Sequence, residues 1–135
     1  MHSSFSKSAL FTDLYELTMA QGYWKNNMNE PVVFDMFFRR QPFNGGFSIF
    51  AGIEPLLDSL TEFCFDEDEI DYLRSLKIFE DGFLEYLRTF KFTGDLYSFE
   101  EGSVIFPQEP LVRIHANLIE AQIIEGLVLN ICNFQ

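Results

Sequence analysis

The stretch LFTDLYELTMAQGYW, residues 10–24, predicts a helix with two apolar faces. Thr12 precedes the first periodic apolar residue and is the expected N-cap, while the Asn-rich run before Pro31 should end the helix at about Asn26. The helical period places Leu14, Leu17, Gln21 and Trp24 on one face and Tyr15, Met19, Gly22 and Tyr23 on another. A surface helix normally shows one apolar stripe, so the Tyr15 face requires a second partner.

A strand is predicted next, over VVFDMFFRR, residues 32–40. Alternate positions are apolar on both faces, which is typical of a strand that is central in its sheet or covered on both sides. The following segment QPFNGG, residues 41–46, predicts a turn or loop. FSIFAG, residues 47–52, then predicts a short strand or extended segment.

Three short helices are expected in succession. Pro55 fits the first turn of a helix that runs to about Phe63, and Asp66 with Glu69 forms a capping-box pattern at the start of the second. Asp81 precedes the third, FLEYLRTF, residues 83–90. These helices predict a helical layer.

The pattern changes to short β-rich runs between residues 92 and 118, punctuated by Gly94, Gly102, Pro107 and Pro110. Two or three antiparallel strands are expected there, followed by a helix from about Ile119 with one recurring apolar face. The predicted fold class is therefore α+β, with helices packed on a mainly antiparallel sheet. The last helix reaches Gln135 without a Gly cap or a basic last turn, so we expect the N-terminal part of a longer protein.

Composition narrows the classes of partner. The 135 residues are 47% hydrophobic and carry a formal charge of -12, which opposes binding to nucleic acid or to an anionic membrane. The sequence has neither a signal-peptide pattern nor an apolar run long enough for a membrane span, so a cytoplasmic protein is expected. Cys64 and Cys132 lie among apolar neighbours and are expected to be buried free thiols.

Two groups of residues could bind a ligand. Arg39 and Arg40 end an apolar strand beside a Gly-containing loop, where adjacent guanidiniums could clamp phosphate or simply balance the acidic excess. Tyr15 combines a flat ring with a helix N-terminus, which suits a small aromatic acid, although the residues alone favour packing of Tyr15, Met19 and Tyr23 on a neighbouring element.

Other candidate sites are weaker on the residues alone. The acidic run Asp66–Asp71 lacks the pattern of a calcium loop and is interpreted as a solvated helix start. His115 has no nucleophile or metal-spaced partner nearby and is interpreted as a structural or surface residue. No catalytic residue and no metal ligand is predicted, and no phosphate-binding glycine motif is present.

Three stretches taken together resemble nicotinate phosphoribosyltransferase: LFTDLYELTMAQGYW, FDMFFRRQPFNGGFSIFAGIEPLL and EEGSVIFPQEPLVRIHANLIEAQIIEGLVLNICNFQ. The resemblance covers about Leu10 to Gln135, in the family's order. It implies the N-terminal α/β domain of a type II phosphoribosyltransferase without most of the irregular α/β barrel. On this basis, residues 1–9 would be an N-terminal extension, 10–118 the domain, and 119–135 a helix leading into the barrel.

The resemblance also implies a reaction. Such enzymes join nicotinate to 5-phosphoribosyl 1-diphosphate in the Preiss–Handler salvage route to NAD, with coupled hydrolysis of ATP and a requirement for Mg²⁺. They work as head-to-tail homodimers with active sites shared between subunits. The nicotinamide-specific relative is the alternative within the class, and a stand-alone acidic protein-interaction domain is the alternative outside it.

Site residues carry over by position. Tyr15 resembles the tyrosine that stacks on the pyridine ring, Asp13 would lie beside that ring, and Arg40, or its neighbour Arg39, resembles a basic residue that reaches phosphate across the subunit interface. The family's phosphorylatable histidine belongs to the barrel, and His115 does not match it. The resemblance therefore implies that this chain alone holds no catalytic residue and is inactive by itself.

Overall fold

The computed structural model describes residues 8–133 of the chain. Its elements are, in order, η1 (Ala9–Phe11), α1 (Leu14–Lys25), β1 (Pro31–Met36), η2 (Pro42–Asn44), β2 (Ser48–Ile49), α2 (Ile53–Glu62), α3 (Glu67–Ser75), α4 (Asp81–Arg88), β3 (Asp95–Ser98), β4 (Val104–Ile105), β5 (Val112–Asn117) and α5 (Leu118–Asn133). The first seven residues of the predicted extension and the helix end predicted at Gln135 lie outside the described residues.

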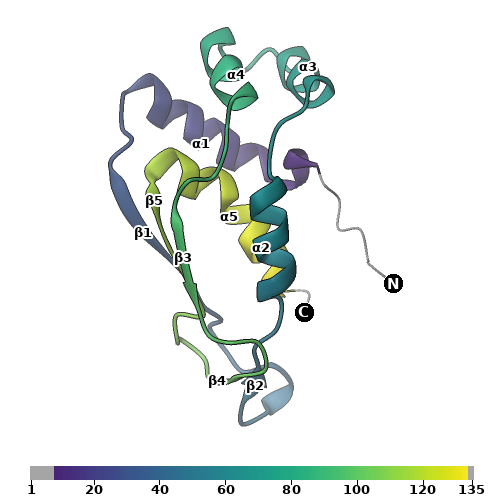
Figure 1. Cartoon of the computed structure of the whole chain (residues 1–135), viewed down its shortest axis with the longest axis vertical. Helices are drawn as coiled ribbons and strands as arrows, with labels where there is room; N and C mark the ends of the chain where they lie inside the picture. The colour runs from purple at the N-terminus through teal and green to yellow at the C-terminus, as the bar shows by residue number, and fades with distance from the viewer. Residues whose placement is uncertain (1–7, 134–135) are drawn as a thin grey trace.

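The strands confirm the predicted α+β class with antiparallel pairing. β5 lies between β1 and β3 and is antiparallel to both, and β2 pairs with β4 in a second, two-stranded sheet. In Figure 1 the two-stranded sheet lies at one end of the molecule, while α1, α3 and α4 lie at the other. Two or three strands are expected between residues 92 and 118, and three are present, as β3, β4 and β5.

The prediction that the strand after Pro31 is central or covered on both sides is wrong. β1 is an edge strand, and β5 occupies the centre of the sheet. Val33 on its outer face is 54% exposed, whereas Met36 on its inner face is buried. The predicted alternation of inner and outer residues is present, but apolar residues on both faces of a strand do not show that both faces are covered within one chain.

α5 forms the centre of the helical layer. It contacts β1 and β5 of the sheet and also packs against α1 and α2. Its buried residues therefore lie all around the helix, whereas the sequence predicted a single recurring face. None of the helices in the part of the chain that the structure describes is long and apolar enough to cross a membrane.

The first long helix begins one residue later than predicted. Asp13, and not Thr12, is the N-cap, and Asp13 N–H donates to the carboxylate of Glu16 at 3.3 Å. The face that α1 buries consists of Glu16, Leu17 and Ala20. Leu17 belongs to the first predicted stripe, whereas Glu16 and Ala20 lie between the two stripes. One side of the helix is thus committed to the core, and Tyr15 stays outside it.

The three middle helices match their predictions closely. Asp66 caps α3 with the expected capping box, since Glu69 N–H donates to Asp66 Oδ1 at 2.8 Å and Asp66 N–H donates to Glu69 Oε2 at 3.0 Å. The third helix has Glu80 as its N-cap, one residue before the predicted Asp81.

The two thiols differ in exposure, which corrects one prediction. Cys64 is exposed, because it lies in the connection between α2 and α3, whereas Cys132 is partly buried in the last turn of α5. Burial raises the pKa of the Cys132 thiol to about 11.

Candidate functional site

The first turn of α1 presents Tyr15 to solvent. The side chain is 68% exposed, and Asp13 immediately before the helix is also exposed. The N–H groups and the dipole of the first turn favour a negative charge at this point, and the tyrosine ring offers a stacking face beside it. The packing interpretation of Tyr15 is thus not supported within the described chain.

Beneath that exposed turn lies a buried carboxyl group that the sequence reading missed. Glu16 is 5% exposed, and the Thr12 hydroxyl donates a hydrogen bond to its Oε2. Burial, the largest effect, raises the pKa of the Glu16 carboxyl; the hydrogen bonds from Thr12 and Asp13 act in the opposite direction, and Glu125 reinforces the rise. The D-x-x-E spacing of residues 13–16 is a capping-box signal that could have identified Glu16.

Gly126 allows α5 to approach this carboxyl group. A Cβ atom at position 126 would lie 2.6 Å from Glu16 Oε2 and 3.1 Å from Oε1. The backbone of α5 therefore packs directly against Glu16. The Thr12 hydroxyl also lies 3.2 Å from the carbonyl oxygen of Ile123 on the same helix, so the first turn of α1 is joined to α5 at two points.

Arg39 and Arg40 lie in the bend after β1 and are both exposed. The other three arginines form ion pairs: Arg74 with Asp71, Arg88 with Glu67, and Arg113 with Asp35. Within residues 8–133, neither Arg39 nor Arg40 has a hydrogen-bonded or ionic partner for its guanidinium. No acidic side chain of the described residues forms an ion pair with either arginine. This favours phosphate binding, and not local charge balance, as the role of the two arginines.

Several exposed apolar side chains come from the segments on either side of the arginine pair and from β4. Phe43 is fully exposed and has φ 55° and ψ 25°, a left-handed conformation that is unfavourable for a bulky residue. The other members come from residues 37–49 and 104–106, which meet at the β2–β4 pair: Phe37, Phe47, Ile49, Val104 and Phe106. We call these six residues the aromatic tip. Such a concentration of exposed apolar groups is typical of an interaction surface.

One chain does not bring the two predicted groups together. Figure 1 shows that α1 begins beside η1 and the end of α2, whereas the chain after β1 runs away from them toward β2 and β4. No hydrogen bond or ion pair among the described residues joins Asp13 or Tyr15 to the arginine pair. A site that uses both groups needs a second chain.

The structure also places the two weaker candidates, His115 and the acidic run Asp66–Asp71. His115 is exposed on the outer face of β5, where its ring lies 5.0 Å from that of Tyr97. The acidic run opens α3, although Glu69 within it is buried. Among residues 8–133, no group of three or more His, Cys, Asp or Glu side chains is placed to hold a metal ion.

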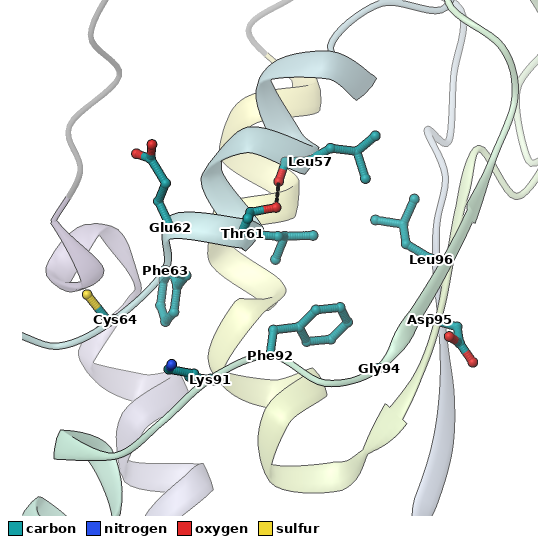
Figure 2. Close-up of a pocket in the computed structure, with 11 residues that line it drawn as sticks. Leu57, Thr61, Glu62, Phe63, Cys64, Lys91, Phe92, Gly94, Asp95 and Leu96 are labelled. Carbon is teal, nitrogen blue, oxygen red and sulfur yellow. Dashed lines mark hydrogen bonds between the residues drawn. The ribbon is translucent and has the colours of Figure 1, made fainter.

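A separate pocket of about 570 Å³ lies between α2 and the chain that enters β3. Figure 2 shows Leu57, Phe92 and Leu96 facing one another there, with Cys64 and Lys91 at one end. None of the four sequence-predicted site residues lines this pocket. Its lining mixes apolar side chains with polar and charged ones, namely Thr61, Glu62, Lys91 and Asp95.

Comparison with protein families identifies a relationship over almost the whole chain. A family model described as the nicotinate phosphoribosyltransferase (NAPRTase) N-terminal domain matches residues 10–133. Nicotinate phosphoribosyltransferase pncB2 of Mycobacterium tuberculosis (strain ATCC 25618 / H37Rv) is 47% identical over 127 residues, which are 94% of this chain and 27% of the relative. Nicotinate phosphoribosyltransferase of Bacillus subtilis (strain 168) is 44% identical over 128 residues, 94% of this chain and 26% of the relative. The chain thus spans about a quarter of the length of these curated relatives.

Solved structures agree with this relationship. The crystal structure of human nicotinic acid phosphoribosyltransferase matches with a TM-score of 0.81 at 32% identity, over 90% of this chain and 25% of the human chain. Nicotinate-nucleotide pyrophosphorylase from Pyrococcus furiosus matches with a TM-score of 0.68 at 18% identity, over 93% of this chain and 25% of that chain, which shows a shared fold alone.

Proposed function

Because this chain belongs to the nicotinate phosphoribosyltransferase family and has the fold of its N-terminal domain, we propose that it forms part of an enzyme that joins nicotinate to 5-phosphoribosyl 1-diphosphate. The products would be nicotinate mononucleotide and diphosphate, in the Preiss–Handler route of NAD salvage. The observation that carries the proposal is Tyr15, an aromatic side chain held exposed at the start of a helix that is otherwise anchored in the core.

In this proposal the first turn of α1 receives nicotinate. The ring of Tyr15 stacks on the pyridine ring, and the helix N-terminus attracts the carboxylate of nicotinate. When the pyridine nitrogen attacks the anomeric carbon and diphosphate leaves, the ring gains a positive charge. The carboxylate of Asp13, exposed beside Tyr15, is suited to stabilise that charge.

Phosphate groups are assigned to the other end of the molecule. The unpaired guanidiniums of Arg40 and Arg39 can each donate two parallel hydrogen bonds to phosphate oxygens. Together the two arginines carry two positive charges. No carboxylate of the described chain forms an ion pair with them. Arg40 is the first choice, and Arg39 is its neighbouring alternative.

Since α1, which carries Tyr15 in its first turn, lies apart from the segment after β1, which carries the arginine pair (Figure 1), we propose a head-to-tail homodimer in which each active site takes Tyr15 from one subunit and Arg40 from the other. The aromatic tip supports this arrangement, because a partner subunit would cover its exposed side chains. Mixing a Tyr15→Ala variant with an Arg40→Ala variant of the complete gene product tests it. Random assortment should restore about a quarter of the wild-type activity, from the one intact site of each mixed dimer. No recovery would place both residues in the same subunit's site.

ATP hydrolysis with Mg²⁺ is proposed as a coupled reaction of the complete enzyme. The described residues contain no cluster of metal ligands, so we assign no step to a protein-bound Mg²⁺ here. We also propose that the enzyme works in the cytoplasm. We further propose that the 135-residue chain does not catalyse the reaction by itself. Assays of the chain alone test the last point, and assays of the complete gene product with and without ATP test the coupling.

The direct test of the function is a substrate comparison. The complete product of the reading frame is assayed with 5-phosphoribosyl 1-diphosphate and either nicotinate or nicotinamide, and diphosphate release is measured. Use of nicotinate is the expected result. Exclusive use of nicotinamide would favour the related enzyme, and activity with neither would favour a protein-interaction domain.

A further inference from the structure

The carboxyl group of Glu16 lies at the joint between α1 and α5. Oε2 accepts hydrogen bonds from the Thr12 hydroxyl and from Asp13 N–H, and Gly126 packs against both carboxyl oxygens. Glu16 thus occupies the inner side of the turn whose outer side carries Tyr15.

The Thr12 hydroxyl is shared between two acceptors. It lies within hydrogen-bond distance of Glu16 Oε2 and also 3.2 Å from the Ile123 carbonyl oxygen. A hydroxyl has a single proton to donate, so it cannot serve both oxygens when Glu16 is ionised. If Glu16 is protonated, the acid donates to the oxygen of Thr12, and Thr12 is free to donate to Ile123. Protonation therefore satisfies every member of the chain of hydrogen bonds.

The charges around Glu16 favour the same state. Glu125 faces it from α5, and Asp13 lies beside it on its own helix, so both neighbouring ionisable groups are acidic. No Lys or Arg of the described chain forms an ion pair with Glu16. Burial and these carboxylates together raise the pKa of the Glu16 carboxyl above its ordinary value of 4.5.

We propose that Glu16 is a positioning residue whose protonated carboxyl group, through Thr12, holds the first turn of α1 in place on α5. The effect of this contact on nicotinate binding rests on the proposed function of Tyr15. As the pH rises and Glu16 ionises, Thr12 turns to the carboxylate, the bond to Ile123 is lost, and the turn that carries Asp13 and Tyr15 loosens. Nicotinate binding therefore weakens.

The first experiment measures the turn itself and needs no substrate. Hydrogen exchange of the Glu16 and Leu17 amides, which both donate to the carbonyl oxygen of Asp13, is followed in the 135-residue chain from pH 4.5 to pH 8, after correction for the intrinsic rates. In the wild-type protein, protection should fall as the pH rises. In Glu16→Gln, whose amide resembles the protonated acid, protection should remain high and independent of pH. In Thr12→Val it should be low at every pH.

Glu120→Gln is the matched control. Glu120 is also a buried carboxyl group, 8% exposed, but it accepts its hydrogen bonds from the backbone N–H and hydroxyl of Thr93, away from α1. This variant should keep the wild-type pH dependence at the Glu16 and Leu17 amides. Protection that is independent of pH in the wild-type protein, or that changes equally in wild type and Glu16→Gln, would overturn the proposal.

The second experiment measures the consequence in the complete gene product. The KM for nicotinate should rise several-fold with pH in the wild-type enzyme relative to Glu16→Gln. If the exchange results hold but the two KM profiles coincide, the positioning role toward nicotinate is refuted. If the wild-type enzyme does not use nicotinate at all, the proposed function fails, and hydrogen exchange alone still decides whether Glu16 holds the turn.

Discussion

Gly126 of α5 lies directly against the carboxyl group of Glu16 in α1, so close that a Cβ atom there would stand 2.6 Å from Oε2. A glycine inside a helix normally weakens it by up to about 1 kcal/mol relative to alanine. At position 126 that cost is offset, because the absence of a side chain allows α5 to pack directly against the carboxyl group of Glu16. The two helices meet over a buried carboxyl group whose hydrogen bonds to Thr12 and Asp13 fix the start of α1.

Gly126→Ala should destabilise the chain by about 1–3 kcal/mol, because the new methyl group displaces a buried, hydrogen-bonded carboxyl group. Gly22→Ala in α1 is the matched control. No atom lies within 4 Å of a Cβ at position 22, so that change should stabilise the chain slightly. Urea unfolding measures both. In a Glu16→Ala background the penalty of Gly126→Ala should largely disappear, and a penalty that persists there would argue against the contact as its cause.

The Asp35–Arg113 ion pair on the outer face of the sheet should give a defined pH dependence. Arg113 Nε and Nη2 donate to the two carboxylate oxygens of Asp35 at 2.7 and 2.8 Å, and this pairing lowers the pKa of Asp35 below 3.8. The stabilisation is therefore present above pH 3.8 and is lost as the pH falls through the lowered pKa.

Asp35→Asn should consequently reduce the free energy of unfolding more at pH 7 than at pH 2.5. Asp95→Asn is the control, since Asp95 lies on the same face, opposite His115, and forms no ion pair among the described residues. An equal effect of Asp35→Asn at both pH values would contradict the assignment.

The two cysteines should react at very different rates with a thiol reagent. Cys64 is exposed, whereas Cys132 is partly buried and its pKa is raised to about 11, which leaves about one thiolate in a thousand at pH 8. Ellman's reagent at pH 8 should show one fast thiol per chain. Cys64→Ser should remove the fast phase and Cys132→Ser should keep it; a fast phase that survives Cys64→Ser would show that Cys132 is accessible.

The helices could be predicted from local signals, but their surroundings could not. The capping box of Asp66 and Glu69 marked the start of α3 because it depends on neighbouring residues alone. The position of β1 at the sheet edge depends on which strands pair with β5. Val33 and Phe37 are apolar although they are exposed, so their residue types do not indicate an edge strand. The burial of α5 on all sides likewise follows from three neighbours that lie far away in sequence.

The candidate site shows the same division. Tyr15 was found from its place in an apolar helix and from the family resemblance, both of which are visible in the sequence. Glu16 was missed because a glutamate in a helix is usually exposed, and its burial is created by Gly126 more than a hundred residues later. The left-handed backbone of Phe43 was also invisible, since a bulky residue gives no sequence signal for a positive φ.

The central claim is that the exposed ring of Tyr15 binds nicotinate, and steady-state kinetics of Tyr15→Ala in the complete gene product test it most directly. Tyr72→Ala is the control, because Tyr72 is an exposed tyrosine of similar accessibility on α3. We predict that Tyr15→Ala lowers kcat/KM for nicotinate, and that the decrease corresponds to a loss of about 1–3 kcal/mol of transition-state stabilisation, the range for loss of an aromatic stacking partner. Tyr72→Ala should leave kcat/KM unchanged. Wild-type kinetics for nicotinate in the Tyr15→Ala enzyme would contradict the claim.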